Sequence, residues 1–419
     1  MPSSETPDVY VWVWLPGATE PVVAGVLTVE GQSTSFTYGA SYRSRPDAVP
    51  LYLPELPLRS GQIAPLASLR IAGCITDAGP DSWGRRVIDY RRFGAGDQDA
   101  FELHDLAYLL ESGSDRIGGL DFQARADVYQ PRLAGGSLEE LMEAAARLEA
   151  GEPFSPELDE ALFQGSSIGG ARPKALLADG DRGLIAKFSS TTDQFPVVKA
   201  EGVAMALARR VGLNVAKSTV VRSVGKDVLL VERFDRTDVL GQRKLMVSAL
   251  TMLELDEMMG RYATYPALAD VIRERFEQPA LTLRELFGRI VFNICVSNTD
   301  DHARNHAAFW NGESLELTPA YDICPQPRSG GEAAQAMAIR REVDPLSRAS
   351  RRSQFATCVA AAHEYLLSQA DAREIIDHQI DVIETQWLSA AEEVRLSATE
   401  AAQLRERQIL NPFAFEDAL

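Results

Sequence analysis

The sequence has few cysteines and no long apolar run. Its cysteines lie far apart and form no C-x-x-C pair: Cys74, Cys295, Cys324 and Cys358. We therefore expect a reduced, cytoplasmic protein without disulfides or structural zinc. No apolar segment approaches the ~18 residues that a membrane-spanning helix needs, so no transmembrane helix is expected. The first residues lack the basic start and the cleavage site of a secretory signal, and we expect none.

Basic residues are also scarce relative to acidic ones. The chain carries 42 Lys and Arg against 60 Asp and Glu, a net charge of −18. A general binder of nucleic acid or anionic membranes needs a net basic surface, so neither direct nucleic-acid binding nor membrane binding is expected. With 419 residues, 45% of them hydrophobic, the chain is long enough to bury a core and to form two or three domains. Wholesale disorder is therefore excluded.

Local patterns divide the chain into three predicted regions. Residues 1–130 begin with an antiparallel meander of strands over 9–40 and should form a small β-rich domain. Residues 131–235 carry a β-β-α-β-β pattern, and residues 236–419 are mainly helical. A β-rich lobe followed by a helical lobe predicts a two-lobed α+β fold, with a ligand site between the lobes.

Turn and capping signals place the individual elements. A capping box of Ser137 and Glu140 starts a helix that ends near Gly151. Before this helix, short helices are expected at 82–90 and 101–111, and a turn into a short strand at 118–122. After it, the expected elements up to residue 235 are strands at 174–178, 183–189, 215–224 and 227–234 and a helix at 199–211. Beyond residue 245 the expected helices are 245–255, 267–276, 283–297, 355–367, 370–383 and 385–406.

The most informative stretch is NTDDHARN, residues 298–305. Asp300 precedes Asn305 by five residues, and Asp322 follows Asn305 by seventeen. This layout is typical of a phosphoryl-transfer site, in which Asp300 would orient and deprotonate the attacking hydroxyl. Asn305 and Asp322 would hold Mg²⁺ against the nucleotide phosphates. The alternative is an Asp- and Asn-rich loop that only caps helices and makes turns.

A lysine in the middle of an apolar strand is the second signal. Lys187 lies in the segment LIAKF, where an unpaired lysine is costly. Glu201, near the start of the next helix, is the expected partner. ATP sites use such a Lys–Glu pair to hold the α- and β-phosphates. The alternative is an edge lysine whose charged end reaches solvent.

Two further segments flank this strand. In SSIGGARPK, Gly169 and Gly170 would let backbone amides approach phosphates, although the segment matches no standard phosphate-loop pattern. Glu232, Arg233 and Phe234 end the last strand of the region. A backbone carbonyl and amide there could take an adenine edge, with Phe234 against the ring. A plain core position is the alternative for Phe234.

These motifs together resemble the HipA-type serine/threonine kinases, the toxin components of bacterial toxin–antitoxin pairs. The segments that carry the resemblance are SIGGARPK (167–174), AKF (186–188), VERFDR (231–236), TDDHARN (299–305), Tyr321-Asp322, GPDSWGRR (79–86) and DRIGGLDF (115–122). The resemblance spans nearly the whole chain. It implies a protein-kinase-like fold with a small β-rich N-terminal domain, a small lobe within 131–235 and a helical C-terminal lobe within 236–419.

The resemblance also implies roles for individual residues. Asp300 would be the catalytic base, Asn305 and Asp322 the Mg²⁺ ligands, and Ser167 or its neighbour Ser166 the autophosphorylated serine. The implied ATP-binding residues are Gly169, Gly170, Ala171, Arg172, Pro173, Lys174, Lys187, Glu201, Glu232, Arg233, Phe234, His302, Ala303, Arg304, Asn305 and Asp322.

Two positions depart from the family pattern. Pro173 removes one amide from the phosphate loop, so Arg172 or Lys174 would supply charge instead. Asp301 adds a carboxylate beside the base, and we expect it to be a solvated neighbour rather than a metal ligand.

The expected function is that of an ATP- and Mg²⁺-dependent protein serine/threonine kinase. By resemblance, it would arrest growth by phosphorylating a protein such as an aminoacyl-tRNA synthetase, and a DNA-binding antitoxin would be its partner. A nucleotide-binding pseudokinase or corepressor and a small-molecule kinase are the alternatives. Lys187, Asp300, Asn305 and Asp322 together argue against a non-catalytic module, which has no physical need for all four.

Overall fold

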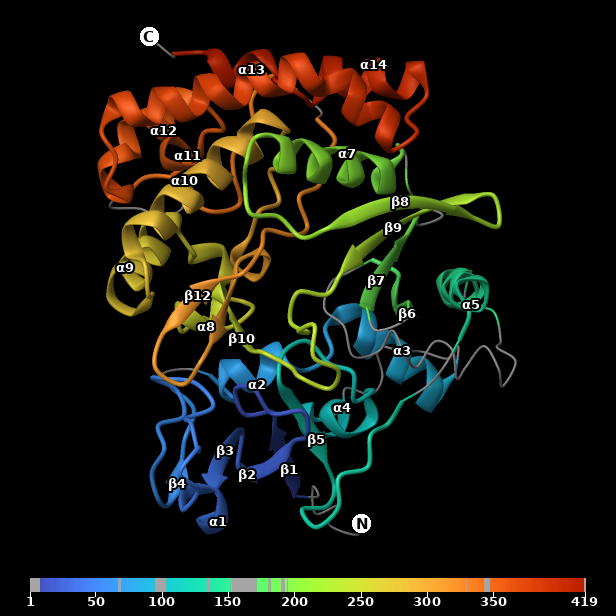
Figure 1. Cartoon of the computed structure of the whole chain (residues 1–419), viewed down its shortest axis with the longest axis vertical. Coiled ribbons are helices and arrows are strands. Elements are labelled where there is room, and N and C mark those ends of the chain that lie inside the picture. The colour runs from blue at the N-terminus through green and yellow to red at the C-terminus, as the bar shows by residue number, and fades with distance from the viewer. Residues whose placement is uncertain are drawn as a thin grey trace.

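The chain forms three antiparallel sheets, of five, three and four strands. The computed structural model describes residues 8–66, 69–94, 103–133, 136–150, 152, 172–179, 182–189, 193, 195–328, 330–342 and 347–417. We refer to residues 8–133 as the N-terminal unit, 136–232 as the small lobe, 233–236 as the interlobe segment and 237–417 as the large lobe. Figure 1 shows the N-terminal unit at the bottom and the two lobes above it.

The N-terminal unit is built on a sheet with the strand order β4-β3-β2-β1-β5. Its elements are β1 (Val9–Val13), β2 (Val22–Glu30), β3 (Ser33–Tyr38), α1 (Ala40–Arg43), β4 (Gln62–Ile63), α2 (Gly73–Asp77), α3 (Ser82–Phe93), α4 (Asp105–Glu111) and β5 (Leu120–Gln123). The meander predicted from the sequence is confirmed as β1 to β3. Strand β1 lies between β2 and β5, and its Val9, Val11 and Val13 are completely buried.

The small lobe confirms the predicted β-β-α-β-β order. Its elements are α5 (Leu138–Ala150), β6 (Lys174–Asp179), β7 (Arg182–Phe188), α7 (Val197–Arg210), β8 (Ser218–Ser223) and β9 (Lys226–Glu232). The strands pair in the order β6-β7-β9-β8. The capping box before α5 is present, since the amide of Glu140 donates to Ser137 Oγ and the amide of Ser137 to Glu140 Oε2.

The two faces of this sheet are covered by different helices. Ala186 and Phe188 of β7 pack in one cluster with residues of α3 and α5. Lys187 points to the opposite face because side chains alternate along a strand, and α7 covers that face. Gly202 lets α7 come close, since a Cβ there would lie 2.6 Å from Val220 Cγ2. The alternation therefore directs Lys187 at α7.

The large lobe combines a small sheet with helices. Its elements are β10 (Leu245–Ser248), α8 (Ala249–Met252), η3 (Gly260–Tyr262), α9 (Tyr265–Arg275), α10 (Pro279–Cys295), η4 (Ala303–Asn305), β11 (Ala307–Trp310), β12 (Leu315–Leu317), α11 (Arg348–Arg351), α12 (Phe355–Ala361), η5 (Ala362–Tyr365), α13 (Gln369–Glu393), α14 (Ala398–Arg407) and η6 (Pro412–Phe415). No helix among the described residues is both long enough and apolar enough to cross a bilayer.

Two predictions about these elements are wrong. Residues 245–248 are a strand rather than the start of a helix, because they pair with β11 from more than fifty residues downstream. Local periodicity does not report such a partner. The helix expected to break near residue 384 continues as α13 to Glu393. The break comes at Ser397, which caps α14 together with Glu400.

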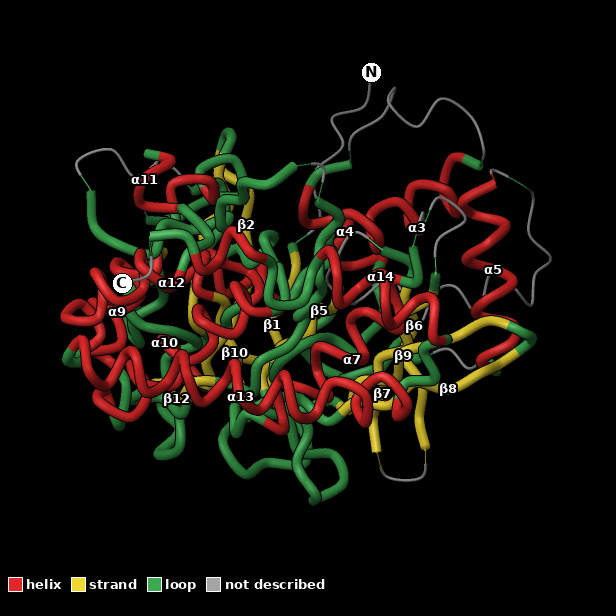
Figure 2. Tube along the Cα trace, turned by 90° about the horizontal axis from the view of Figure 1, so that it is seen from above, coloured by secondary structure: helices red, strands yellow, loops and turns green. Residues whose placement is uncertain are grey.

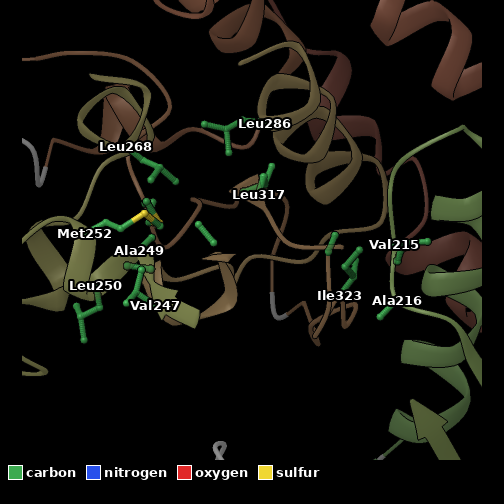
Figure 3. Packing of buried hydrophobic residues seen from close by; sticks show 14 of the residues in the cluster. Val215, Ala216, Val247, Ala249, Leu250, Met252, Leu268, Leu286, Leu317 and Ile323 are labelled. Carbon is green, nitrogen blue, oxygen red and sulfur yellow. The ribbon is translucent and has the colours of Figure 1, made fainter. Parts of the chain in front are cut away.

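Helix α13 packs against both lobes. It contacts α7 of the small lobe and α10 of the large lobe, and Figures 1 and 2 show it lying across them. Glu393 near its end accepts from Arg209 and Arg210 of α7 at 2.7 and 2.8 Å. One hydrophobic cluster runs through all three parts of the chain. Figure 3 shows a section of this core, with Val215 at one side of the view and Met252 at the other.

Candidate nucleotide and phosphoryl-transfer site

Lys187 lies between two carboxylates from different elements. Its Nζ is 2.6 Å from Oε1 of Glu201, which the second turn of α7 supplies. It also donates to Oδ1 of Asp322, which follows β12. The Lys187 and Glu201 side chains are 17% and 7% exposed, whereas that of Asp322 is 44% exposed. The structure therefore brings three of the predicted site residues together, with Asp322 on the accessible side.

The charges in this group support one another. Burial by itself would lower the pKa of Lys187, but Asp322 and Glu201 raise it well above its ordinary value. The ammonium of Lys187 lowers the pKa of Asp322 to about 2. Burial raises the pKa of Glu201 in spite of Lys187. With both carboxylates ionised, the three groups carry a net charge of −1, and the exposed member is an anion.

The segment from 298 to 306 carries the other half of the site. Asp300 is exposed, and its backbone carbonyl accepts from the amide of His302 at 3.0 Å and from Asn305 Nδ2 at 3.3 Å. The pKa of the Asp300 carboxyl is raised by partial burial and, against the effect of His302, by the charges of Asp322 and Asp301. A raised pKa brings a carboxylate closer to the range in which it acts as a general base.

The structure corrects the expectation for Asp301, which is buried rather than solvated. Its Oδ2 accepts from the Tyr265 hydroxyl at 2.5 Å and from Asn293 Nδ2 at 2.7 Å, and it lies 2.8 Å from His306 Nε2. These partners come from α9, α10 and the residue before β11. Asp301 therefore anchors the loop that carries Asp300. Its donors are too distant in sequence to leave a local signal.

Two aromatic side chains connect Asp322 to its surroundings. The hydroxyl of Tyr321 donates to the backbone carbonyl of Arg304 at 2.6 Å. The Phe234 ring packs on Tyr321 and Phe309, with centroids 5.6 and 6.0 Å away. Phe234 thus belongs partly to the core. Asp322 itself has φ of 59°, in the left-handed region, where non-glycine residues are uncommon and cluster at functional sites.

Arg233 does not join the Lys187 group. Its side chain is 1% exposed, and its guanidinium binds Asp115 of the N-terminal unit and Asp235. Its backbone amide donates to the carbonyl of Gly183 at 2.9 Å, and the amide of Glu232 donates to Lys217 O at 2.8 Å. Both of these amides are therefore already paired within the protein.

Only the end of the predicted phosphate loop lies within the described residues. Ser166, Ser167, Gly169, Gly170 and Ala171 lie outside them. The guanidinium of the exposed Arg172 binds Asp193 at 2.6 Å, and the carbonyl of Pro173 accepts from the amide of Phe188. Lys174 pairs with Lys187 across the two strands, so both face the same side. Its buried Nζ is 3.9 Å from Asp81 of the N-terminal unit.

The sequence also gives no sign of a contact that links the N-terminal unit, through Ser248 and Ala249, to the segment 298–306. The half-buried carboxylate of Asp77, at the end of α2, accepts from the amide and the hydroxyl of Ser248, each at 2.7 Å. The next amide, of Ala249, donates to the carbonyl of His306. A single Asp more than 160 residues before its partner carries no recognisable pattern in one sequence.

Comparison with known proteins identifies the family of the chain. Residues 166–387 match the HipA-like C-terminal domain. A Sinorhizobium fredii protein named "Putative kinase Y4mE" is 27% identical over 246 residues, which cover 52% of this chain and 57% of that protein. The serine/threonine-protein kinase toxin HipA of Shewanella oneidensis is 26% identical over 166 residues, 35% of this chain and 38% of that protein.

A solved structure extends the match to nearly the whole fold. HipA of Shewanella oneidensis MR-1, in complex with HipB and operator DNA, superposes with a TM-score of 0.68 at 19% sequence identity. The match covers 94% of this chain and 95% of that one. The predicted two-lobed, kinase-like α+β fold is thereby confirmed. Since the HipA-like C-terminal domain spans more than half of the 419 residues, the chain belongs to the HipA family.

Proposed function

We propose that the protein is an ATP- and Mg²⁺-dependent protein serine/threonine kinase. The observation that carries this proposal is the junction of Lys187, Glu201 and Asp322 between the two lobes. A cation held by a buried carboxylate next to an exposed, ionised one is the charge arrangement that nucleotide phosphates and a divalent metal require. The exposed Asp300 on the neighbouring loop supplies a base whose pKa is raised.

The residues present fit a magnesium ion. Mg²⁺ takes hard oxygen ligands and needs only one or two protein carboxylates when phosphates and water complete its shell. Asp322 is ionised and accessible, and the amide of Asn305 would add a neutral oxygen. The metal would neutralise charge on the phosphates. Among the described residues no group of three or more His, Cys, Asp and Glu could hold a metal without such help.

The remaining chemistry falls to the chain itself. Lys187 and Lys174 would bind the negatively charged phosphates, while Glu201 keeps Lys187 in place. Asp300 would orient a serine or threonine hydroxyl and accept its proton as the γ-phosphoryl group of ATP moves to that oxygen and ADP leaves. Asp301 keeps the Asp300 loop in position through its three contacts. Backbone groups of 232–234 would line the adenine side, and His302 to Asn305 the phosphate side.

The partners proposed here rest on the family. Since the Shewanella HipA structure contains HipB and operator DNA, we propose a DNA-binding antitoxin as partner. The proposed substrate is a protein such as an aminoacyl-tRNA synthetase, whose phosphorylation would arrest growth. Ser167 is the proposed site of autophosphorylation. By resemblance, Ser167 belongs to the phosphate loop, and a phosphate on it would add ≈ −1.5 to −2 charge that should weaken ATP binding.

The decisive experiment compares the wild type with Asp300→Asn. This change is nearly isosteric and removes the base, so transfer should fall by at least ~10²-fold while ATP binding persists. Phosphopeptide mass spectrometry of cells that express either protein should show sites present only with the wild type, Ser167 among them. A variant that keeps a tenth of the wild-type activity would refute Asp300 as the main base. ATP binding without any transfer by the wild type would point to the pseudokinase alternative.

A further inference from the structure

A loop of the N-terminal unit binds the interlobe segment through charged groups. This loop lies between α4 and β5. Oδ1 of its Asp115 accepts from Arg233 Nη1 at 2.9 Å and from Arg236 Nη2 at 2.6 Å. The backbone carbonyl of the next residue, Arg116, accepts from the same two guanidinium groups at 2.5 and 2.8 Å. Two arginines of the interlobe segment are therefore held by adjacent acceptors from one loop.

A second carboxylate closes the network from the other side. Asp235 accepts from Arg233 through both oxygens, at 2.9 and 2.7 Å, and from Arg236 at 2.8 Å. The amide of Gly118 donates to the same carboxylate at 2.7 Å. The side chains of Arg233 and Asp235 are 1% and 3% exposed. Buried, bidentate and charge-assisted contacts of this kind hold a backbone in one conformation far better than surface ion pairs do.

The interlobe segment lies between the two halves of the candidate site. It follows β9, whose Leu229 pairs with Lys187. It leads to β10, which pairs with β11 just beyond the Asp300 loop. The interlobe segment therefore connects the Lys187 half of the site to the Asp300 half. Any change in its backbone alters the spacing between the two halves.

The same N-terminal unit touches each half directly. Asp81 lies 3.9 Å from Nζ of Lys174 on the small-lobe side. Asp77 accepts from Ser248 on the large-lobe side. Three carboxylates of one unit thus meet the small lobe, the large lobe and their connection. This arrangement suits an element that fixes the lobes relative to each other.

We propose that Asp115 is a positioning residue for nucleotide binding, because it holds the interlobe segment in the conformation that spaces Lys187 and Asp300 for one Mg²⁺–ATP. This inference rests on the proposed kinase function. When Asp115 is absent, the interlobe segment populates other conformations. The apparent affinity for the nucleotide then falls in proportion to the fraction of molecules that remain competent to bind it.

The test measures ATP kinetics of the full-length Asp115→Ala variant. The Asp115 side chain is 40% exposed, so its removal leaves no closed cavity. The matched control is Asp127→Ala in the same unit, which removes a carboxylate that is 58% exposed and paired with Arg125. We expect KM and Kd for Mg²⁺–ATP to rise about fivefold or more in Asp115→Ala only, with kcat at saturating ATP within about twofold of the wild type. If Asp115→Ala does not fold, Asp115→Asn takes its place.

A double-mutant cycle makes the assignment specific. Arg236→Ala removes a partner of the same carboxylate, so its effect on KM and that of Asp115→Ala should not add. An unchanged KM for ATP in Asp115→Ala, whatever its melting temperature, would overturn the inference. A lowered melting temperature and kcat at constant KM would do the same, since that is the result of a purely structural role. If the wild type itself neither binds nor uses Mg²⁺–ATP, the proposed kinase function fails instead.

Discussion

At the scale of single residues, the charge balance at Lys187 determines what the site can accept. One ammonium faces two carboxylates, and only Asp322 of the two is substantially exposed. A phosphate entering this site would compete with Asp322 for Lys187, while Glu201 keeps its contact from α7. A divalent cation would remove that competition by taking up the freed carboxylate. The proposed function therefore requires nucleotide and metal to bind together.

Lys187→Arg tests how tightly this group is packed. Arginine keeps the charge, but its planar guanidinium is larger and cannot replace a compact ammonium 2.6 Å from Glu201. We expect ATP-dependent transfer to fall at least about tenfold, which is the effect of losing one charge-assisted contact. Lys226→Arg, at an exposed position of the same sheet, is the control. Equal activity of Lys187→Arg and the wild type would show that the lysine makes no close phosphate contact.

The sequence contains enough to predict some of these residue contacts. The Lys187–Glu201 pair follows from a lysine in an apolar strand and a glutamate early in the next helix. The third member of the group, Asp322, lies 135 residues from Lys187 in the sequence, and no local pattern indicates the contact between them. For the same reason the sequence predicts a solvated Asp301, and this prediction is wrong. Its environment is made by Tyr265, Asn293 and His306, which only the tertiary fold brings together.

At the scale of elements, the loop between α10 and β11 depends on one buried oxygen. Oδ2 of Asp301 meets donors from two helices and from the residue before β11. Most of the helices and strands around this loop were predictable, because their hydrophobic patterns and caps are local. Strand β10 was not, because its identity comes from pairing with β11. The loop is thus well placed only when distant elements have assembled.

Asp301→Ala should be strongly destabilising. The substitution leaves the buried donors of Tyr265 and Asn293 without an acceptor, and each lost partner costs ~1–3 kcal/mol. We expect the free energy of unfolding to fall by about 3 kcal/mol, measured by urea denaturation. Asp301→Asn keeps an oxygen for these donors and should lose much less. Equal stability of the two variants would mean that the contacts of Oδ2 do not hold the loop.

At the scale of the whole molecule, charged groups join the N-terminal unit to the rest of the chain. The half-exposed Asp115 and the buried Asp235, with their arginines, connect this unit to the interlobe segment. Contacts between residues more than a hundred positions apart could not be inferred from one sequence.

The buried Asp235 also makes the stability of the protein depend on pH. Burial opposes ionisation of Asp235, but Arg233 and Arg236 lower its pKa overall. Its contribution is therefore present above the unfolded pKa and is lost as the pH falls.

Glu55 should make the protein less stable as the pH rises, which is the opposite of the effect of Asp235. Its buried carboxylate accepts from the amides of Gly73 and Cys74 at the start of α2, yet burial raises its pKa from 4.5 to about 7. A raised folded pKa gives a contribution that is complete below the unfolded value and is lost as the pH rises through the folded one. The wild type should thus lose up to about 3 kcal/mol of stability between pH 4.5 and pH 7 through this group.

The Glu55→Gln variant tests this loss of stability with rising pH. It cannot titrate, so its melting temperature should change less than that of the wild type between pH 5 and pH 7. Glu20→Gln, at an exposed position of the same unit, should follow the wild type. Parallel pH profiles of Glu55→Gln and the wild type would show that Glu55 does not take up a proton in this range.

Helix α13 constrains how the two lobes can move apart. It spans the outer side of both lobes through α7 and α10, while the N-terminal unit holds their connection. A free hinge rotation would pull α7 away from α13 and break the contacts of Glu393 with Arg209 and Arg210. Sliding of α7 along α13 would keep apolar surface covered throughout. We therefore expect nucleotide entry and release to proceed by shear between packed helices, in small displacements, rather than by wide separation of the lobes.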